Sequence, residues 1–313
     1  MKVAFVIPFF GANATGGAET ECLQTAYHLA SAGLEIEVMT TCALDLHHEW
    51  HIDCHRKGTR IEEGLLVHRF PIEKVDFSGL FELNRRLLSH QTLCPEEEKR
   101  FLAMHVNSLP LLRTLAKTAK TYDKVCFIPY LFGTTYYGAL LCPGNAVLIP
   151  CLHDEPYARM SVMPRLFDCV SKVVFHTGAE QRLADSLYGD LSGKGILMGE
   201  GVDTSLSAAG ERFRDKYNIR SPFILYAGRK SPTKNIDTLV RYFTAYRSSV
   251  SRDLKLVLIG PGTVAIPGEM KNEIIDLGFI SEQDKKDACA AADILCQPSL
   301  NESFSLIIME AWI

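Results

Sequence analysis

The amino-acid sequence predicts an α/β fold of two Rossmann-like domains, whose parallel sheets face each other across a cleft. Three observations lead to this prediction. The 313 residues are more than one ordinary hydrophobic core holds. Short apolar, β-branched runs alternate with segments of helical period over the whole chain. A stretch rich in Gly, Ser and charged residues, 199–221, divides these runs into two series and predicts a linker.

The predicted strands are short runs of apolar and β-branched residues, as expected for parallel strands covered by helices on both faces. In the first series they are 2–7, 35–40, 124–129, 146–150, 172–176 and 196–199. In the second series they are 223–227, 255–259, 274–279 and 293–297. The linker then separates a domain of residues 1–203 from one of residues 204–313.

The segment 81–120 is longer than one crossover needs and carries helical patterning. Its apolar positions include Leu109, Leu112, Leu115 and Ala116. We expect one or two helices of the first domain, which serve either in ordinary packing or as a surface that faces an acceptor or a membrane.

Composition restricts the class of protein. Hydrophobic residues make up 47% and charged residues 22% of the chain, which is typical of a soluble globular protein. A net charge of −4 gives no basic footprint, so no nucleic-acid partner is predicted. The ten cysteines are scattered without a CxxC pair and are predicted to be mostly reduced core residues.

The N-terminal run carries no signal-peptide pattern. A single Lys precedes a short apolar run that Pro8 interrupts. No stretch of the chain approaches the roughly 20 apolar residues that span a bilayer. We therefore expect a cytoplasmic protein whose contact with a membrane, where there is any, is peripheral.

Ligands of doubly wound sheets bind at the carboxyl ends of the strands, so the strand-to-helix loops hold the candidate site. Gly16 and Gly17 follow the first strand and precede a helix. They let backbone N–H groups approach an anion there, although a structural tight turn explains them equally well. Neither a Walker motif nor a GxGxxG fingerprint is present, which makes a dinucleotide oxidoreductase a distant alternative.

The loop after strand 223–227 contains Gly228, Arg229 and Lys234. The two cations flank a Pro-containing turn at the carboxyl end of the strand, where they can neutralise a diphosphate leaving group. Solvation on the surface is the alternative for either cation alone.

Glu302 and Glu310 are predicted to lie at the start of a helix and about two turns inside it, with both carboxylates toward one side. The amides from Ser303 to Leu306 then point at an anion beside Glu302, although a carboxylate at a helix start is often only a cap. His153 follows strand 146–150, and its loop position favours a functional role over packing.

Residues 47–55 concentrate strong metal ligands, among them His47, His48, His51, Cys54 and His55. Their spacing matches no zinc signature. We expect a loop or surface helix here and no metal site in the protein.

Taken together, these motifs resemble glycosyltransferase family 4, whose members have the GT-B fold and retain the anomeric configuration. Supporting segments are 201–203 at the domain junction, 278–281 and 292–294. The motifs that carry the resemblance are Gly16-Gly17-Ala18-Glu19, Gly228-Arg229 with Lys234, and Glu302 with Glu310.

The resemblance implies a role for each matched residue. Arg229 and Lys234 bind the donor diphosphate and replace the divalent metal of other glycosyltransferases. Glu302 contacts the transferred sugar and Glu310 the ribose. The remaining implied donor contacts come from Gly16, Gly17, Gly228, Ser303, Phe304, Ser305 and Leu306. His153 faces the sugar from the first domain, which is the acceptor side, while the second domain binds the donor.

The implied activity is transfer of a hexose from a UDP- or GDP-sugar to a glycan or lipid-linked acceptor in surface-polysaccharide synthesis, with no cofactor and no metal. A nucleotide-sugar epimerase of the same fold and a non-catalytic nucleotide-binding module are the alternatives. Ser305 stands where the family usually has Gly. The chain ends inside the helix of Glu310, where family members continue, so we expect an incomplete second domain.

Overall fold

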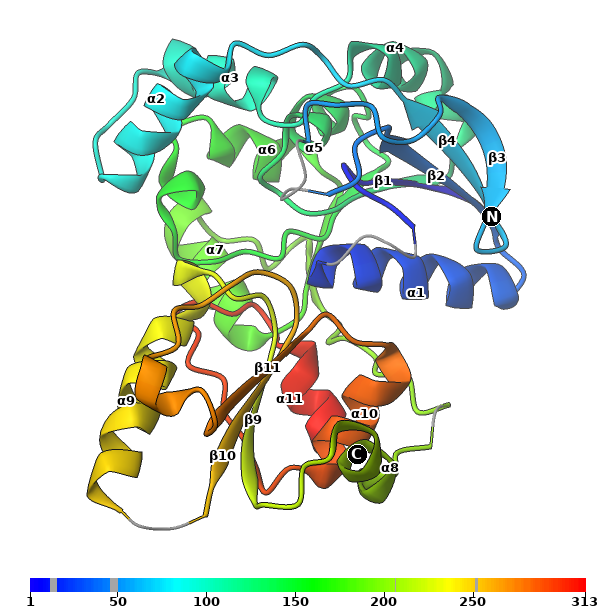
Figure 1. Cartoon of the computed structure of the whole chain (residues 1–313). Coiled ribbons are helices and arrows are strands. Elements are labelled where there is room, and N and C mark those ends of the chain that lie inside the picture. Colours follow the sequence, from blue (N-terminus) through cyan, green and yellow to red (C-terminus); the bar gives the residue numbers. More distant parts are fainter. Residues whose placement is uncertain (12–15, 46–49, 206, 251–252) are drawn as a thin grey trace. The chain divides into compact units, whose positions relative to one another are not determined.

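The protein consists of two compact α/β units, Met1–Glu200 and Gly201–Ile313 (Figure 1). The computed structural model describes residues 1–11, 16–45, 50–205, 207–250 and 253–313. Each unit is a sheet of mostly parallel strands with helices on both faces, as the sequence predicts. The division lies close to the predicted boundary at residue 203.

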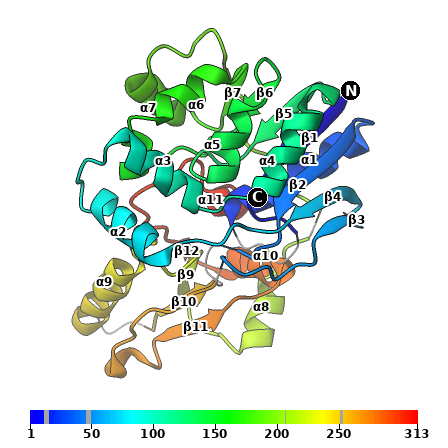
Figure 2. The same ribbon diagram turned by 90° about the horizontal axis from the view of Figure 1, so that it is seen from above.

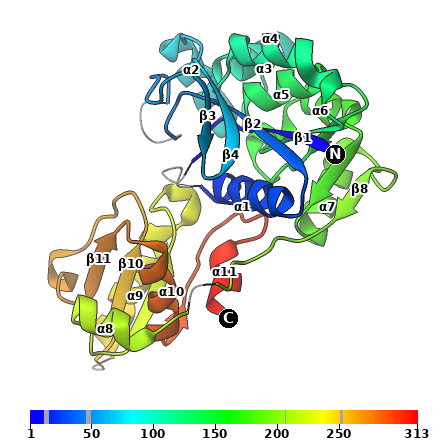
Figure 3. The ribbon, with the colours of Figure 1, turned by 90° about the vertical axis from the view of Figure 1, so that its right-hand side faces the viewer.

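The first unit has an eight-stranded sheet in the order β3-β4-β2-β1-β5-β6-β7-β8. Figure 3 shows β3 and β4 at one edge and β8 at the other. All neighbours are parallel except β3 and β4, which form an antiparallel pair. The strands are β1 (Lys2–Val6), β2 (Glu35–Thr41), β3 (Gly58–Glu62), β4 (Leu65–Phe70), β5 (Lys124–Phe127), β6 (Ala146–Leu148), β7 (Lys172–Phe175) and β8 (Gly195–Leu197).

The six strands predicted in this unit are confirmed, but the hairpin of β3 and β4 was not predicted. A two-residue turn joins its strands, with Glu63 at φ 50° and Gly64 at φ 78°. These positive φ angles suit the tight turns of hairpins. The edge strand β3 has mostly exposed and polar residues, so it lacks the apolar run on which the other predictions rest.

Alternate residues of β1 point into two separate cores, one on each face of the sheet. Val3 and Phe5 pack with Cys22 and Ala26 of α1, while Ala4 and Val6 face the larger core under the other helices. Figure 2 shows α3, α4, α5 and α6 gathered on that second face. The helices are α1 (Gly17–Ser31), α2 (Phe77–Leu88), α3 (Pro95–Met104), α4 (Leu109–Thr118), α5 (Gly133–Leu140), α6 (Met163–Cys169) and α7 (Gly178–Tyr188), with short 3-10 turns at η1 (Ala119–Thr121) and η2 (Pro156–Arg159).

The sequence predicts one or two helices in 81–120, but the segment contains parts of three, α2, α3 and α4. The buried stripe of α4 also differs from the predicted one. Leu111, Leu112 and Leu115 are buried, whereas Leu109 and Ala116 are exposed. Among the described residues, none of the helices is both long and apolar enough to cross a bilayer.

The second unit has a parallel sheet in the order β11-β10-β9-β12. Helix α9 covers one face, and α8 and α10 cover the other (Figure 1). The elements are α8 (Gly210–Tyr217), β9 (Phe223–Ala227), η3 (Pro232–Lys234), α9 (Ile236–Ser249), β10 (Lys255–Ile259), η4 (Gly268–Met270), β11 (Ile274–Gly278), α10 (Glu282–Ala291), β12 (Ile294–Leu295) and α11 (Leu306–Ala311). The four predicted strands are confirmed, with β12 shorter than predicted.

The predicted linker 199–221 is wrong over part of its length, because it contains α8. This helix is strongly charged, and its apolar signal is limited to Phe213 and Tyr217. Phe213 is fully buried in the core formed with β9 and α10. Phe213 thus attaches the helix to the core, and the ion pairs Arg212–Asp287 and Lys216–Asp284 join it to α10.

The loops after β9 and β10 approach each other so closely that two positions require glycine. Gly260 has φ +117°, and a Cβ atom there would lie 2.2 Å from the carbonyl oxygen of Gly228. At Gly262, with φ +94°, it would lie 2.7 Å from the carbonyl oxygen of Lys230. The Lys230 N–H donates to the Pro261 carbonyl at 2.8 Å, so the two backbones are joined at this level.

We expect Gly260→Ala to lower the free energy of unfolding by about 3–5 kcal/mol, because backbone atoms cannot yield as a side chain can. Gly278→Ala is the matched control, since Gly278 also has positive φ but faces no atom within 4 Å. The free energy of unfolding of that control should fall by only about 1–2 kcal/mol, the cost of placing a side chain in the left-handed conformation. Chemical denaturation followed by circular dichroism measures both, and equal losses would contradict the steric explanation.

His105 packs among aromatic rings at the end of α3. Its ring centroid is 5.0 Å from that of Phe101 and 5.0 Å from that of Phe132. Burial lowers the pKa of His105 to about 4, well below the ordinary value of a histidine. The folded protein therefore keeps this ring neutral in a pH range where the unfolded chain protonates it.

This histidine should make the first unit sensitive to acid. Between pH of about 6.5 and 4 the unfolded state binds the proton and the folded state does not, so the free energy of unfolding falls as the pH falls, by up to about 1.4 kcal/mol per pH unit. His105→Phe keeps an aromatic ring in place, and its free energy of unfolding should fall less over the same pH range. Denaturant titrations at several pH values measure the difference, and parallel curves for the two proteins would assign the sensitivity to other groups.

Candidate functional site

The loop after β9 brings a predicted cation and a predicted carboxylate together. Lys234 ends η3, and its Nζ atom lies 2.6 Å from Oε1 of Glu302. The two side chains are 31% and 28% exposed, so they form a partly shielded ion pair that solvent and ligand can still reach. The sequence predicts both residues at the site, and the structure adds that they are partners.

Backbone contacts hold this ion pair in place. Asn235 begins α9 in the left-handed conformation, and its Nδ2 group donates to the Pro298 carbonyl at 3.1 Å. The Leu300 N–H donates to the Thr233 carbonyl at 3.4 Å. The loop that follows β9 is therefore attached to the loop that leads to Glu302.

Arg229 is half-buried on the same loop, and Tyr226 positions it from the end of β9. The Tyr226 hydroxyl donates to the Arg229 carbonyl at 2.5 Å. Burial raises the pKa of Tyr226 above its usual range, and the negative charge of Glu302 adds to this effect. Tyr226 therefore fixes the backbone of Arg229, on the same loop that carries Lys234 and its partner contact to Glu302.

The third cation of this loop, Lys230, has a structural role that sequence reasoning missed. Its side chain is fully buried, and Nζ lies 3.0 Å from Oδ1 of Asp276 on β11. It also donates to the Gly260 carbonyl after β10. Lys230 therefore ties together the ends of three strands and is turned away from solvent, unlike Lys234.

Glu310 and Glu302 do not lie together on one side of a helix, although the sequence predicts that they do. Helix α11 begins at Leu306, so Glu310 is about one turn inside it rather than two. Glu310 binds Lys285 of α10 at 2.9 Å, whereas Glu302 binds Lys234. The expectation that both carboxylates share one side of a helix is wrong, because residues 301–305 form a loop.

Lys285 is held between two carboxylates. Its Nζ atom lies 2.7 Å from Glu282 and 2.9 Å from Glu310. Burial alone would lower the pKa of Lys285, but the charges of Glu310 and Glu282 outweigh burial and raise it. The lysine therefore stays charged and fixes the Glu310 carboxylate.

Ser305 adopts a backbone conformation that favours glycine. Its φ and ψ are 72° and 76°, in the left-handed region, and its side chain does not cap α11. A non-glycine residue in this region is strained by about 1–2 kcal/mol. This strain gives a structural reason why glycine would suit the position.

Replacing Ser305 by glycine should therefore raise the stability of the protein. We expect Ser305→Gly to increase the free energy of unfolding by about 0.5–1 kcal/mol, the released strain minus the added entropy of the unfolded chain. Ser303→Gly is the control in the same loop, where φ is not positive, and it should lower stability by about 0.5–1 kcal/mol. A denaturant titration in which both variants lose stability would contradict the assignment of strain to Ser305.

In the first unit, Gly16 and Gly17 lie at the N-terminus of α1, while residues 12–15 of the same loop lie outside the described residues. Gly16 is the N-cap in an extended conformation. A Cβ atom at Gly16 would lie 1.8 Å from Oε2 of Glu19. The Glu19 carboxylate therefore sits against this helix end, and a phosphate would have to displace it.

His153 is half-buried in the loop after β6. Its carbonyl accepts from the Glu155 N–H at 2.9 Å, and Glu155 in turn accepts from the Tyr130 hydroxyl at 2.7 Å. Burial raises the pKa of Glu155 despite the hydrogen bond from Tyr130 and the charge of His153, which act in the opposite direction. The role of His153 toward the sugar stays a prediction.

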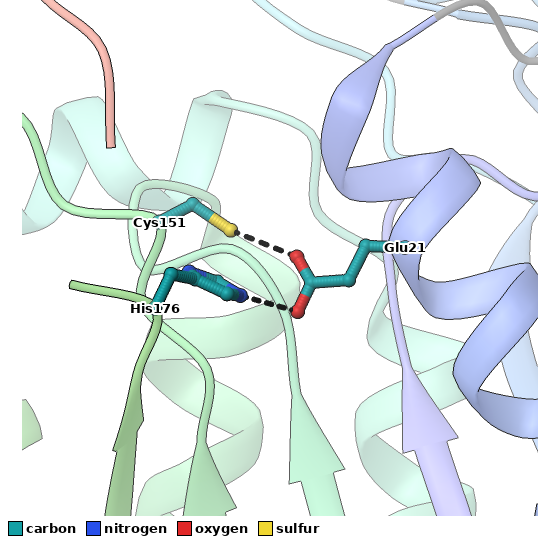
Figure 4. Close-up of side chains that lie close together, drawn as sticks. All are labelled: Glu21, Cys151 and His176. Atoms are coloured by element: carbon teal, nitrogen blue, oxygen red, sulfur yellow. Dashed lines mark hydrogen bonds and ion pairs between the residues drawn. The ribbon is translucent and has the colours of Figure 1, made fainter. Parts of the chain in front are cut away.

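A buried polar cluster in the first unit was not predicted from the sequence. Glu21 of α1, Cys151 after β6 and His176 after β7 point toward one another (Figure 4). Burial alone would lower the pKa of His176, but its hydrogen bonds to Glu180 and Glu21 raise it to about 10. A signal was available, since Cys151 and His176 both fall at the ends of predicted strands.

The histidine-rich segment 47–55 behaves differently. Residues 46–49 lie outside the described residues, which removes His47 and His48 from the structural account. Residues 50–57 form an irregular segment before β3, and His51, Cys54 and His55 are not part of any close group of metal ligands in the described chain.

The second unit matches a known protein family. Residues 210–312 match the family model described as Glycosyl transferases group 1. The match spans every candidate residue of this unit, from Gly228 to Glu310.

Two curated relatives cover different shares of the chain. The D-inositol 3-phosphate glycosyltransferase of Kineococcus radiotolerans is 29% identical over 188 residues, which are 53% of this chain and 43% of that protein. The protein of the same name from Corynebacterium aurimucosum is 26% identical over 337 aligned positions, covering 96% of this chain and 73% of that protein. The chain thus spans less than half of the first relative and about three quarters of the second.

The solved structures confirm the predicted GT-B fold class. Anabaena Alr3699/HepE, solved in complex with UDP and glucose, superimposes with a TM-score of 0.65 over 99% of this chain and 78% of its own. Because the sequence identity is 18%, this likeness shows the fold alone.

Proposed function

We propose that the protein is a retaining glycosyltransferase that moves a hexose from a nucleotide sugar to an acceptor. The observation that carries this proposal is the Lys234–Glu302 ion pair on the loop that also contains Arg229, at the carboxyl end of β9 in the region that matches the glycosyl transferases group 1 family model. In this role the second unit binds the donor and the first unit supplies the acceptor side.

The chemistry follows from the charge on the leaving group. As the bond between sugar and diphosphate breaks, the sugar develops positive charge and the diphosphate negative charge. Arg229 and Lys234 stabilise the diphosphate, so the protein supplies the charge that a divalent metal provides in other transferases. Glu302 binds hydroxyl groups of the sugar, and Glu310, held by Lys285, accepts hydrogen bonds from the ribose hydroxyls.

Retention of configuration then proceeds on one face of the sugar. The acceptor hydroxyl attacks the anomeric carbon from the side that the diphosphate leaves, and the departing phosphate oxygen takes the acceptor proton. No covalent nucleophile takes part in this scheme. The backbone amides of residues 303–306 and of Gly228 complete the donor contacts.

The donor and the acceptor are proposed from the relatives. The Anabaena structure binds UDP and glucose, which makes UDP-glucose the first donor to assay, before GDP-sugars. The curated relatives favour an inositol phosphate as one acceptor class. The other class is a glycan or a lipid-linked glycan of surface-polysaccharide synthesis, for which the protein would work at the cytoplasmic face of a membrane.

The central test replaces the cation that faces the donor. Lys234→Ala should lower kcat/KM for transfer by roughly 10²–10³-fold, because it removes the preorganised positive charge that faces the diphosphate leaving group. Lys271→Ala, an exposed lysine of the same unit, should leave kcat/KM unchanged. Adding Mg²⁺ or Mn²⁺ should not raise the rate of either protein. Transfer measured with radiolabelled UDP-glucose and both acceptor classes provides these numbers.

Several results would contradict the proposal. Full activity of Lys234→Ala would remove the leaving-group mechanism. Release of a free epimerised sugar without an acceptor would favour a nucleotide-sugar epimerase. Binding of UDP in calorimetry, with no turnover of any donor, would favour a nucleotide-binding module.

A further inference from the structure

Three residues far apart in the sequence meet in the first unit at the carboxyl ends of its strands. Glu21 comes from the second turn of α1, Cys151 follows β6, and His176 follows β7 (Figure 4). Oε1 of Glu21 lies 2.6 Å from Nε2 of His176, and Oε2 lies 3.6 Å from Sγ of Cys151. One ligand atom from each residue lies within 4.8 Å of the others.

The three side chains form a ligand set typical of zinc. Zn²⁺ binds thiolate sulfur, imidazole nitrogen and carboxylate oxygen, and sites with three protein ligands leave a fourth position open. The side chains of His176 and Glu21 are 1% and 7% exposed, and Cys151 is half-buried. An ion here would be shielded by protein on most sides.

A second layer of contacts orients the histidine. Nδ1 of His176 lies 3.4 Å from the Glu180 carboxylate, on the side of the ring opposite to Glu21. Glu180 itself accepts from the N–H groups of Leu152 at 2.7 Å and His176 at 2.8 Å. A metal-binding histidine usually donates its other nitrogen to a carboxylate that is fixed in this way.

The backbone and the surrounding charges also fit a cation. Cys151 has φ +50°, a strained angle for a residue with a side chain, and such strain clusters at functional sites. The carboxylates of Glu21 and Glu180 lie close to the cysteine and the histidine, so a cation at this position would meet negative charge.

We propose that Glu21, Cys151 and His176 bind one Zn²⁺ ion, with Glu180 as the outer partner of the histidine. On binding, the thiol of Cys151 releases its proton to become a thiolate, and His176 offers the lone pair of Nε2 in place of its contact with Glu21. The ion joins α1 to the loops after β6 and β7 and keeps one position for water or a ligand. The three residues belong to the first unit, whereas Arg229 and Lys234 belong to the second, and the zinc proposal does not rest on the transferase proposal.

Cobalt, which takes the place of zinc and is coloured, gives the most specific test. Co²⁺ added to the metal-free protein of residues 1–313 should bind at about one equivalent and give a thiolate-to-cobalt charge-transfer band. Cys151→Ser should abolish this band. Two matched controls should keep it, namely Cys22→Ser, a buried cysteine next to Glu21, and Cys54→Ser, an exposed cysteine in the histidine-rich segment.

Zinc affinity tests the second layer. Calorimetry with Zn²⁺ should show that Glu180→Gln weakens binding by about 10- to 100-fold, as the loss of an outer partner of a ligand does. Should a variant fail to fold, the unmodified protein still decides the question. Zn²⁺ should slow alkylation of Cys151 by N-ethylmaleimide, followed by peptide mass spectrometry, and leave Cys54 reactive.

Three outcomes would overturn the proposal. The first is absence of the charge-transfer band in the unmodified protein. The second is a band that Cys54→Ser removes and Cys151→Ser keeps, which would assign the ion to the exposed segment. The third is alkylation of Cys151 at the same rate with and without Zn²⁺, which would leave the cluster as a buried ion pair.

Discussion

The loops after β9 and β10 depend on a backbone contact that leaves no room for a side chain. The carbonyl of Gly228 lies where a Cβ atom of residue 260 would project, so the loops after β9 and β10 meet without an intervening side chain. The buried side chain of Lys230 forms an ion pair with Asp276 on β11. Because three strand ends are fixed to one another, the loop that carries Arg229 and Lys234 starts from a rigid base.

Charge pairing extends this order to the end of the chain. Each late carboxylate has its own lysine, Lys234 for Glu302 and Lys285 for Glu310. These ion pairs orient the carboxylates of Glu302 and Glu310, of which only Glu310 lies on α11. Glu302 owes its position to the loop before α11, and Glu310 owes its position to α10.

Sequence reasoning worked where burial sets the pattern. Ten strands were predicted from apolar runs, and all are present because parallel strands covered on both faces are apolar along their length. The polar edge strand β3 and the charged helix α8 lack that signal, and both were missed. Strand β4 was missed as well, although its alternate residues are buried. The candidate donor residues were placed in loops at strand ends, because such loops can be located from the strands themselves, and their role toward a donor stays a prediction.

Pairings between distant residues were beyond such reasoning. Lys234 and Glu302 are 68 positions apart, and no local pattern states that they touch. Glu21, Cys151 and His176 are single residues in three segments, each unremarkable alone. Only the order of the strands, with β6 beside β7 and α1 near both, brings them together.

The Lys234–Glu302 pair also bears on the entropy of ligand binding. A free lysine side chain loses up to about 2 kcal/mol of rotamer freedom when a ligand immobilises it. Here the carboxylate already restricts the ammonium group before any ligand arrives. Much of the ordering therefore takes place during folding, and a phosphate that meets this lysine finds a cation whose position is already defined.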